Sequence, residues 1–253
     1  MSRTADRLSA AWLEVCERLC EVSPAKGWSA ENGDARGLVS NTAVASLNAA
    51  FSTSVEPDLT SLDEMATEVG GSGVPWSIIV RGDASEAVVA LAARHGLGHR
   101  GEMPLMACSA EDAVLRTNAR NAIHPVCSAG SALYTDVLTA GFEVPEGAFG
   151  ALMGGGVLDT PGFTGYLAEE DGRSVATGLG TEGDGAIGVF NIAVVPSARS
   201  RGLGRAMTAR VMADGFAAGA RTAYLHASAA GRPLYESMGF RLVETWTIFT
   251  ELG

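Results

Sequence analysis

The sequence predicts a mixed α/β fold in which helices flank a central mixed sheet. Short apolar segments typical of buried strands alternate with amphipathic helical segments, and the turns between them are rich in glycine. The chain has 253 residues. This length fits one complete domain with a reduced second one, and we expect the two to span 1–110 and 111–253.

The N-terminal half predicts two helices and a strand–helix–strand unit. Apolar residues recur every three to four positions over 7–22, which favours an amphipathic helix, and a shorter helix is expected over 61–69. A buried strand at 76–80, an alanine-rich helix at 84–95 and a strand at 103–107 then follow.

The first part of the C-terminal half predicts two helices followed by three strands. We expect helices over 128–140 and 145–153, the second with proline in its first turn. Strands are expected at 165–169, 174–180 and 186–195, separated by short turns that contain Asp or Glu and Gly.

The end of the chain continues the alternation of helix and strand. Apolar residues four positions apart predict a helix that begins at Leu203 and ends near Gly219. A strand at 222–227, a short helix at 232–238 and a final strand at 243–249 complete the pattern.

The composition excludes several classes of function. A net charge of −11 disfavours nucleic acid and anionic membranes as partners, and it favours a cationic partner. Lys26 is the only lysine, which excludes a phosphate loop that ends in Gly-Lys-Ser/Thr. The four cysteines are too scattered for a disulfide scaffold or paired zinc ligands, and glycines separate His95 from His99, so we expect no metal site. Without a signal-peptide pattern, a cytoplasmic protein is expected.

The strongest local signal is the basic, glycine-containing turn from Arg199 to Gly204, which lies between a predicted strand and a predicted helix. Gly202 and Gly204 lack the Cβ that would block an approaching phosphate, and backbone N–H groups at a helix N-terminus bind anions. The segment therefore predicts a cradle for a pyrophosphate. A second glycine pattern, 178–183, matches a dinucleotide motif literally but precedes a strand, so we interpret it as a hairpin turn.

Two segments resemble motifs of the GNAT superfamily, the GCN5-related N-acetyltransferases. Ile192 to Gly204 is similar to the family's acetyl-CoA-binding motif, with its signature Arg/Gln-x-x-Gly-x-Gly/Ala. Leu234 to Phe240 resembles the Leu-Tyr-x-x-x-Gly-Phe segment that follows the family's next strand. The resemblance implies a GNAT fold and acetyl-CoA as cosubstrate.

The resemblance also implies roles for individual residues. The backbone of Ile192, Ala193 and Val194 would pair with the pantetheine arm, and Tyr235 would give a proton to the departing thiolate. The cofactor contacts implied around the turn are those of Arg199, Arg201, Gly202, Leu203, Gly204, Arg205 and Ala206, with Ser228 at a position where many relatives have Asn.

The general base is not identified by the resemblance. An amine of pKa about 10.4 needs about 4.6 kcal/mol to be neutral at pH 7, so a group or water chain must accept its proton. His226, beside the predicted cofactor turn, is our candidate, and Glu143 and Glu146 are weaker options. Glu143 and Glu146 lie between the first two helices of the C-terminal half, where proteins of the GNAT superfamily usually shape the acceptor site.

The resemblance therefore implies transfer of an acetyl group to a primary amine of a small molecule or a peptide. A non-catalytic acyl-CoA-binding sensor or scaffold and a longer-chain acyltransferase are the alternatives, and the acceptor is open. The N-terminal half is expected to be a degenerate GNAT-like repeat, because 77–107 repeats the order of 222–249. Aligning Gly96 with Gly239 puts Ala92 opposite Tyr235, so we expect one coenzyme A per chain.

Overall fold

The computed structural model describes residues 3–117 and 122–252, which divide into two compact units. Unit 1 combines Met1–Leu105 with Leu242–Gly253, and unit 2 is Met106–Arg241. This division differs from the expected 1–110 and 111–253. The reason is the last strand, β11 (Arg241–Thr250), whose residues 247–250 pair antiparallel with strand β4 of unit 1.

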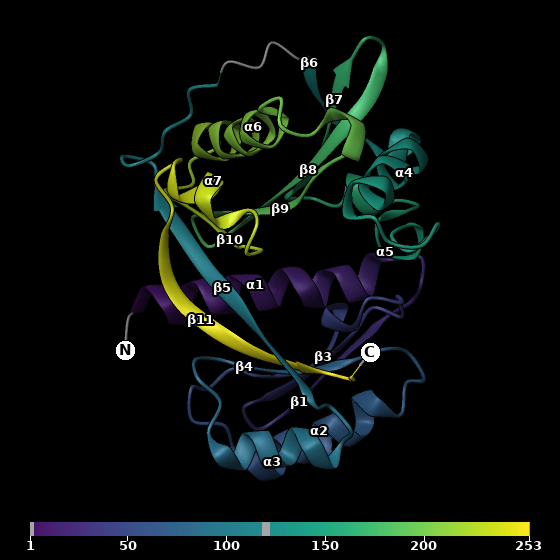
Figure 1. Cartoon of the computed structure of the whole chain (residues 1–253), viewed down its shortest axis with the longest axis vertical. Coiled ribbons are helices and arrows are strands. Elements are labelled where there is room, and N and C mark those ends of the chain that lie inside the picture. The colour runs from purple at the N-terminus through teal and green to yellow at the C-terminus, as the bar shows by residue number, and fades with distance from the viewer. Residues whose placement is uncertain (1–2, 118–121, 253) are drawn as a thin grey trace. The chain divides into compact units, whose positions relative to one another are not determined.

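Unit 1 contains a sheet with the strand order β1-β2-β3-β4-β11-β5, in which β3 and β4 are parallel. Helix α1 lies on one face of this sheet, and α2 and α3 lie on the other (Figure 1). The elements are α1 (Arg3–Val22), β1 (Trp28–Asn32), β2 (Ala35–Val39), the 3₁₀ turn η1 (Ala45–Leu47), β3 (Asn48–Ser52), α2 (Leu59–Gly70), β4 (Ser77–Val80), α3 (Glu86–Arg94) and β5 (His99–Ser109).

Aromatic rings fill the space between α1 and the sheet of unit 1. The ring centroids of Trp12, Phe51 and Trp246 lie 5.1 to 5.2 Å from one another, a spacing typical of favourable aromatic pairs. On the opposite face, Leu62 of α2 and Leu91 of α3 are buried against the sheet. Each face of the unit 1 sheet is thus covered by helices.

Unit 2 is built on the strand order β10-β9-β8-β7-β6, with β9 and β10 parallel. Helices α6 and α4 lie on opposite sides of β7 to β9 (Figure 1). The elements are β6 (Ala122–Val126), η2 (Ser128–Gly130), α4 (Ser131–Phe142), α5 (Gly150–Met153), η3 (Val157–Asp159), β7 (Phe163–Glu170), β8 (Arg173–Gly183), β9 (Ala186–Val194), η4 (Pro196–Ala198), α6 (Leu203–Ala217), β10 (Thr222–His226) and α7 (Arg232–Glu236).

The helix predicted over 145–153 is wrong for its first half, because α5 begins only at Gly150. A left-handed residue inside the predicted range prevents an earlier start. Gly147 has φ 79°, a value that no right-handed helix contains, and Glu143, which ends α4, has φ 56°. Residues 143–149 therefore form an irregular segment between α4 and α5.

The two units repeat one order of elements. In unit 1 the chain runs β1-β2-β3-α2-β4-α3-β5, and in unit 2 it runs β7-β8-β9-α6-β10-α7-β11. In both, the strand before the long helix is parallel to the strand after it. The predicted internal repeat is therefore present, and it begins three strands earlier than the sequence indicated.

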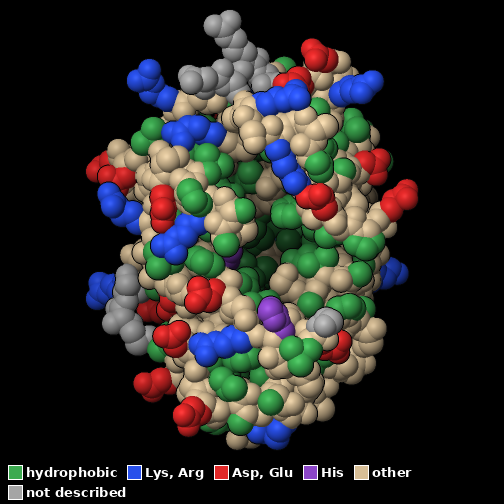
Figure 2. Space-filling view, in the orientation of Figure 1, with side chains coloured by type: hydrophobic (Ala, Val, Ile, Leu, Met, Phe, Trp, Pro, Cys, Tyr) green, Lys and Arg blue, Asp and Glu red, His purple; other side chains and the backbone are tan. Residues whose placement is uncertain are grey.

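Charged side chains are mixed on the surface. Figure 2 shows acidic and basic groups interspersed on the visible face, so the net charge of −11 is not gathered there into one acidic patch. None of the helices within residues 3–117 and 122–252 combines the length and the hydropathy needed to span a bilayer.

Candidate functional site

The site begins where strands β9 and β10 separate. They pair only from Ala186 to Gly188 on β9 and from Thr222 to Tyr224 on β10, although β9 continues to Val194. A groove of about 420 Å³ starts beyond this point. It is lined by Gly141, Ile192, Ala193, Val194, Ala198, Arg199, Ser200, Gly202, Leu203, Gly204, Arg205, Ser228, Ala230, Gly231, Leu234 and Tyr235.

A β-bulge directs the end of β9 into this groove. The register of β8 and β9 shifts between Thr177 and Leu179, and Asn191 in the bulge is left-handed with φ 52°. The Thr177 hydroxyl donates to the Asn191 carbonyl at 2.8 Å, and the Asn191 amide donates to the Tyr134 hydroxyl at 3.3 Å. These bonds fix the bulge, so the following backbone of 192–194 borders the groove.

The turn before α6 has the geometry of an anion cradle. Ser200 and Gly202 are left-handed, with φ 64° and 81°, and such turns make their backbone N–H groups converge. Helix α6 begins without a side-chain cap, and Ala206 N donates to Gly202 O at 3.0 Å. The N–H groups of residues 203–205 come before this first helical bond, so they have no acceptor within the helix. They lie at the positive end of the helix dipole.

The space in front of the turn is open. A Cβ added at Gly202 would meet no heavy atom within 4 Å, and one at Gly204 would come no closer than 3.6 Å, to Leu234. Both glycines therefore leave room at the groove, and neither is needed to avoid a clash inside the protein. This is the arrangement expected where a bound group approaches the backbone closely.

Two of the three arginines of the turn are paired with carboxylates. Arg199 lies 2.7 Å from Glu143, and Arg201 lies 2.6 Å from Glu170. Arg205 instead donates to neutral oxygens, among them the Ser237 hydroxyl at 2.8 Å. Arg205 therefore contributes positive charge to the turn without a carboxylate partner among the contacts of the described residues.

Tyr235 lies on α7 and borders the groove from the side of β10. Its ring packs edge-on against Phe240, with 5.7 Å between the centroids. Burial raises the pKa of its phenol to about 12, so the hydroxyl is protonated at neutral pH and can act as a donor. Ser228, also at the groove, accepts a hydrogen bond of 3.1 Å from Gly231 N.

Five predicted residues do not line the groove, and the weaker base candidates Glu143 and Glu146 are two of them. His226 is half-buried on β10, Arg201 turns toward Glu170, and the Ala206 side chain is buried in the core of unit 2. The N–H of Ala206 is bonded within α6. Their roles in binding and catalysis stay predictions. The structure adds Gly141, at the end of α4, which the sequence marked only as a helix end.

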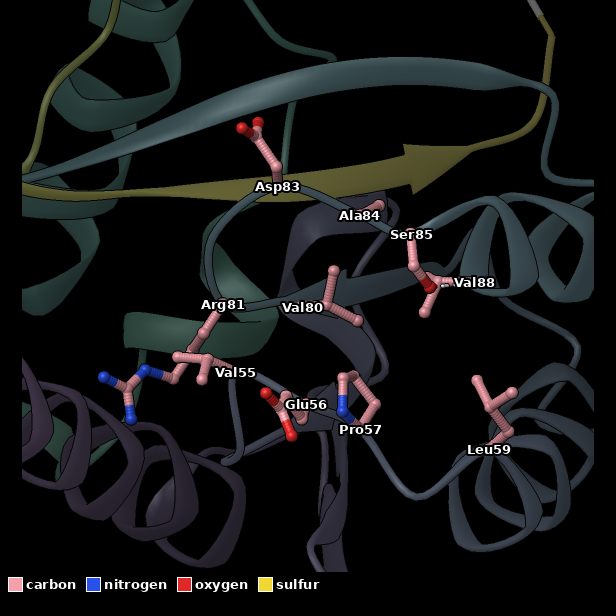
Figure 3. A pocket seen from close by; sticks show the side chains of 10 residues that line it. All are labelled: Val55, Glu56, Pro57, Leu59, Val80, Arg81, Asp83, Ala84, Ser85 and Val88. Carbon is pink, nitrogen blue, oxygen red and sulfur yellow. Dashed lines mark hydrogen bonds between the residues drawn. The ribbon is translucent and has the colours of Figure 1, made fainter. Parts of the chain in front are cut away.

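Unit 1 has a smaller pocket at the matching place in the repeat. About 210 Å³ is enclosed by the segments that follow β3 and β4, the counterparts of β9 and β10 (Figure 3). Here the strands do not separate, because β3 and β4 pair up to Ser52 and Val80. The segment before α2 carries Glu56 and Asp58 and has no basic residue.

Comparison with known proteins identifies the class of fold. Residues 161–242 match the family model of the acetyltransferase (GNAT) domain. A GCN5-related N-acetyltransferase from Kribbella flavida is 19% identical with a TM-score of 0.70, and the match covers 98% of this chain and 96% of that one. A GCN5-related N-acetyltransferase from Sphaerobacter thermophilus is 14% identical with a TM-score of 0.58, over 86% and 76% of the two chains.

A tandem GNAT protein from the clavulanic acid biosynthesis pathway is also similar, at 12% identity and a TM-score of 0.55 over 99% of this chain and 96% of that one. No curated protein matches the sequence. Residues 161–242 thus match the GNAT family model, and the whole chain has the fold of GNAT proteins.

Proposed function

We propose that this protein is an acetyl-CoA-dependent N-acetyltransferase that acts on a primary amine of a small molecule or a peptide. The observation that carries the proposal is the groove of unit 2, in which an uncapped helix N-terminus, a separated strand end and the half-buried phenol of Tyr235 face one space. These three features fit a thioester cofactor that carries a pyrophosphate. Expected acceptors are amines, and the net charge of −11 favours cationic ones.

In this proposal each part of the groove binds one part of the cosubstrate. The backbone of 192–194 pairs with the amide groups of the pantetheine arm, as an added strand would. The converging N–H groups of the turn, with Arg205, hold the pyrophosphate. The thioester then lies on the side of the groove where Tyr235 is placed.

The reaction is direct attack of the amine on the thioester. The nitrogen lone pair forms a C–N bond with the carbonyl carbon, the C–S bond breaks, and the sulfur leaves as a thiolate. Tyr235 donates its proton to this sulfur, and the nitrogen loses a proton to a base. Among the described residues the groove lining has no carboxylate and no imidazole, and His226, which lies on β10 outside the lining, is kept as the proposed base.

The test is a screen of amines with acetyl-CoA, followed through release of the coenzyme A thiol and mass of the product. Propionyl-CoA and longer acyl-CoAs are run in parallel. Amine-dependent thiol release with acetyl-CoA supports the proposal. Thermal stabilisation by acyl-CoA without turnover across the library would instead indicate a sensor or scaffold, and a clear preference for longer chains would indicate another acyltransferase.

A further inference from the structure

The side chain of Arg199 leaves the anion cradle and reaches the end of helix α4. Its Nη2 donates to Gly141 O at 2.8 Å, its Nε donates to Val194 O at 3.2 Å, and its Nη1 lies 2.7 Å from a Glu143 carboxylate oxygen. One guanidinium thus joins the last residue of β9, the end of α4 and the first residue of the segment 143–149.

The end of α4 lies directly on the wall of the groove. A Cβ added to Gly141 would stand 2.8 Å from the Ala193 Cβ and 3.2 Å from Val194 N, which is too close for any other residue. Gly141 and Arg199 both border the groove. Residues 193–194 of the groove wall are therefore in contact with the end of α4, and a shift of these residues would act on it directly.

Glu143 has a backbone conformation that glutamate does not favour. Its φ of 56° and ψ of 37° are left-handed, where glycine or asparagine is the usual residue at a helix end. Local backbone preference does not account for a glutamate here. The ion pair with Arg199 does, because this conformation brings the carboxylate to the guanidinium.

We propose that Arg199 is a positioning residue that couples the acyl-CoA groove to the segment 143–149. The inference rests on the proposed function, since it takes acyl-CoA as the occupant of the groove and 143–149 as a border of the amine site. A cosubstrate on 192–194 fixes the strand end that Arg199 holds, and Arg199 in turn fixes Glu143. Acyl-CoA and amine should therefore strengthen each other's binding, and equally in both directions.

The expected size of this coupling is modest. The side chains of Arg199 and Glu143 are 44% and 58% exposed, and exposed ion pairs contribute little to stability. We therefore expect a coupling of about two- to five-fold in affinity. An effect of this size is measurable when paired and control variants are compared in the same assay.

Hydrogen exchange of the amides in 141–149 tests the coupling without turnover. Coenzyme A should slow this exchange in the wild type and lose the effect in Arg199→Gln and Glu143→Gln. Glu170→Gln is the matched control, because it breaks the 2.6 Å pair with Arg201 in the same turn and leaves 143–149 untouched. In that variant coenzyme A should still slow the exchange.

Steady-state kinetics gives a second reading. Arg199→Gln and Glu143→Gln should each raise KM for the amine about two- to five-fold with a smaller change in kcat, and the double variant should be no worse than either. Arg199→Lys should recover part of the loss, since it keeps the charge. Additive losses, or a fall of kcat in Glu143→Gln alone, would contradict the coupling.

The two proposals can fail separately. If coenzyme A binds the wild type but leaves exchange in 141–149 unchanged, or protects all variants alike, the coupling is overturned and the proposed function stands. If coenzyme A and acetyl-CoA do not bind the folded wild type at all, the proposed function fails and the coupling fails with it.

Discussion

In unit 1 the Nη1 atom of Arg81 donates a hydrogen bond of 3.0 Å to the carbonyl oxygen of Thr53. This bond joins the residues just after β3 to those just after β4. The corresponding strand ends of unit 2, those of β9 and β10, are the ones that separate to form its groove. Arg81 is only 5% exposed and is paired with Glu244 at 3.0 Å and with Asp6 at 2.8 Å. In Figure 3 its side chain extends away from Leu59 and Val88 of the pocket.

The first prediction is that one coenzyme A binds per chain. Unit 1 has its strand ends tied together and carries acidic residues where a pyrophosphate would lie, so its pocket does not suit the cofactor. Isothermal titration of the wild type should give a stoichiometry of one. A second equivalent, or binding that persists after the groove of unit 2 is blocked, would contradict this interpretation.

Much of the fold was predictable because the C-terminal half follows simple patterns. Its strands at 163–194 alternate with turns, and its long helix repeats apolar residues every four positions. The strands β1 and β3 were missed because they consist largely of Ala, Ser, Asn and Glu, residues with low β-propensity. Pairing with neighbouring strands determines their conformation, and a sequence window does not contain these partners.

The candidate site was predictable only for residues that belong to one continuous sequence motif. The turn from Arg199 to Gly204 and the residue Tyr235 belong to continuous motifs, and the structure places them along one groove. Two of the three partners of Arg199 come from positions 141 and 143, far away in sequence, and no local pattern indicates them. The division of the units was missed for a similar reason, since β11 pairs with β4 across the length of the chain.

The second prediction concerns Gly204. Valine at this position should weaken coenzyme A binding at least ten-fold, because its branched methyl groups enter the space in front of the turn. A Cβ there makes only ordinary contacts, the nearest at 3.6 Å, so the variant should fold normally. Titration calorimetry and the unfolding temperature are the two measurements.

Gly204→Ala is the matched control for this substitution. The GNAT signature accepts alanine at this position, so binding should stay within a few-fold of the wild type. Gly202→Val is a poorer probe, because φ of 81° strains any branched residue and mixes a folding defect with the loss of binding. Normal affinity in a folded Gly204→Val protein would show that the turn does not hold the pyrophosphate.

The third prediction concerns the cysteines, which also affect any thiol-release assay. Burial raises the pKa of the Cys20 thiol and of the Cys108 thiol to about 11 and raises that of Cys16 as well, so few thiolates form at these positions below pH 9. Cys127 is exposed. Native protein at pH 8 should therefore show one fast-reacting thiol, and Cys127→Ser should remove it. Rapid reaction of several thiols in the native protein would contradict the burial.

The last prediction is that Tyr235→Phe lowers turnover ten-fold or more and leaves acetyl-CoA affinity nearly unchanged. The substitution removes the proton donor and keeps the ring that packs on Phe240. Because burial raises the pKa of the phenol to about 12, its protonated form persists to higher pH than that of a free tyrosine. The wild-type rate should therefore show no loss from Tyr235 ionisation up to pH 10, and pre-steady-state kinetics should be used so that chemistry limits the rate. Equal rates for the two proteins under these conditions would remove Tyr235 from the mechanism.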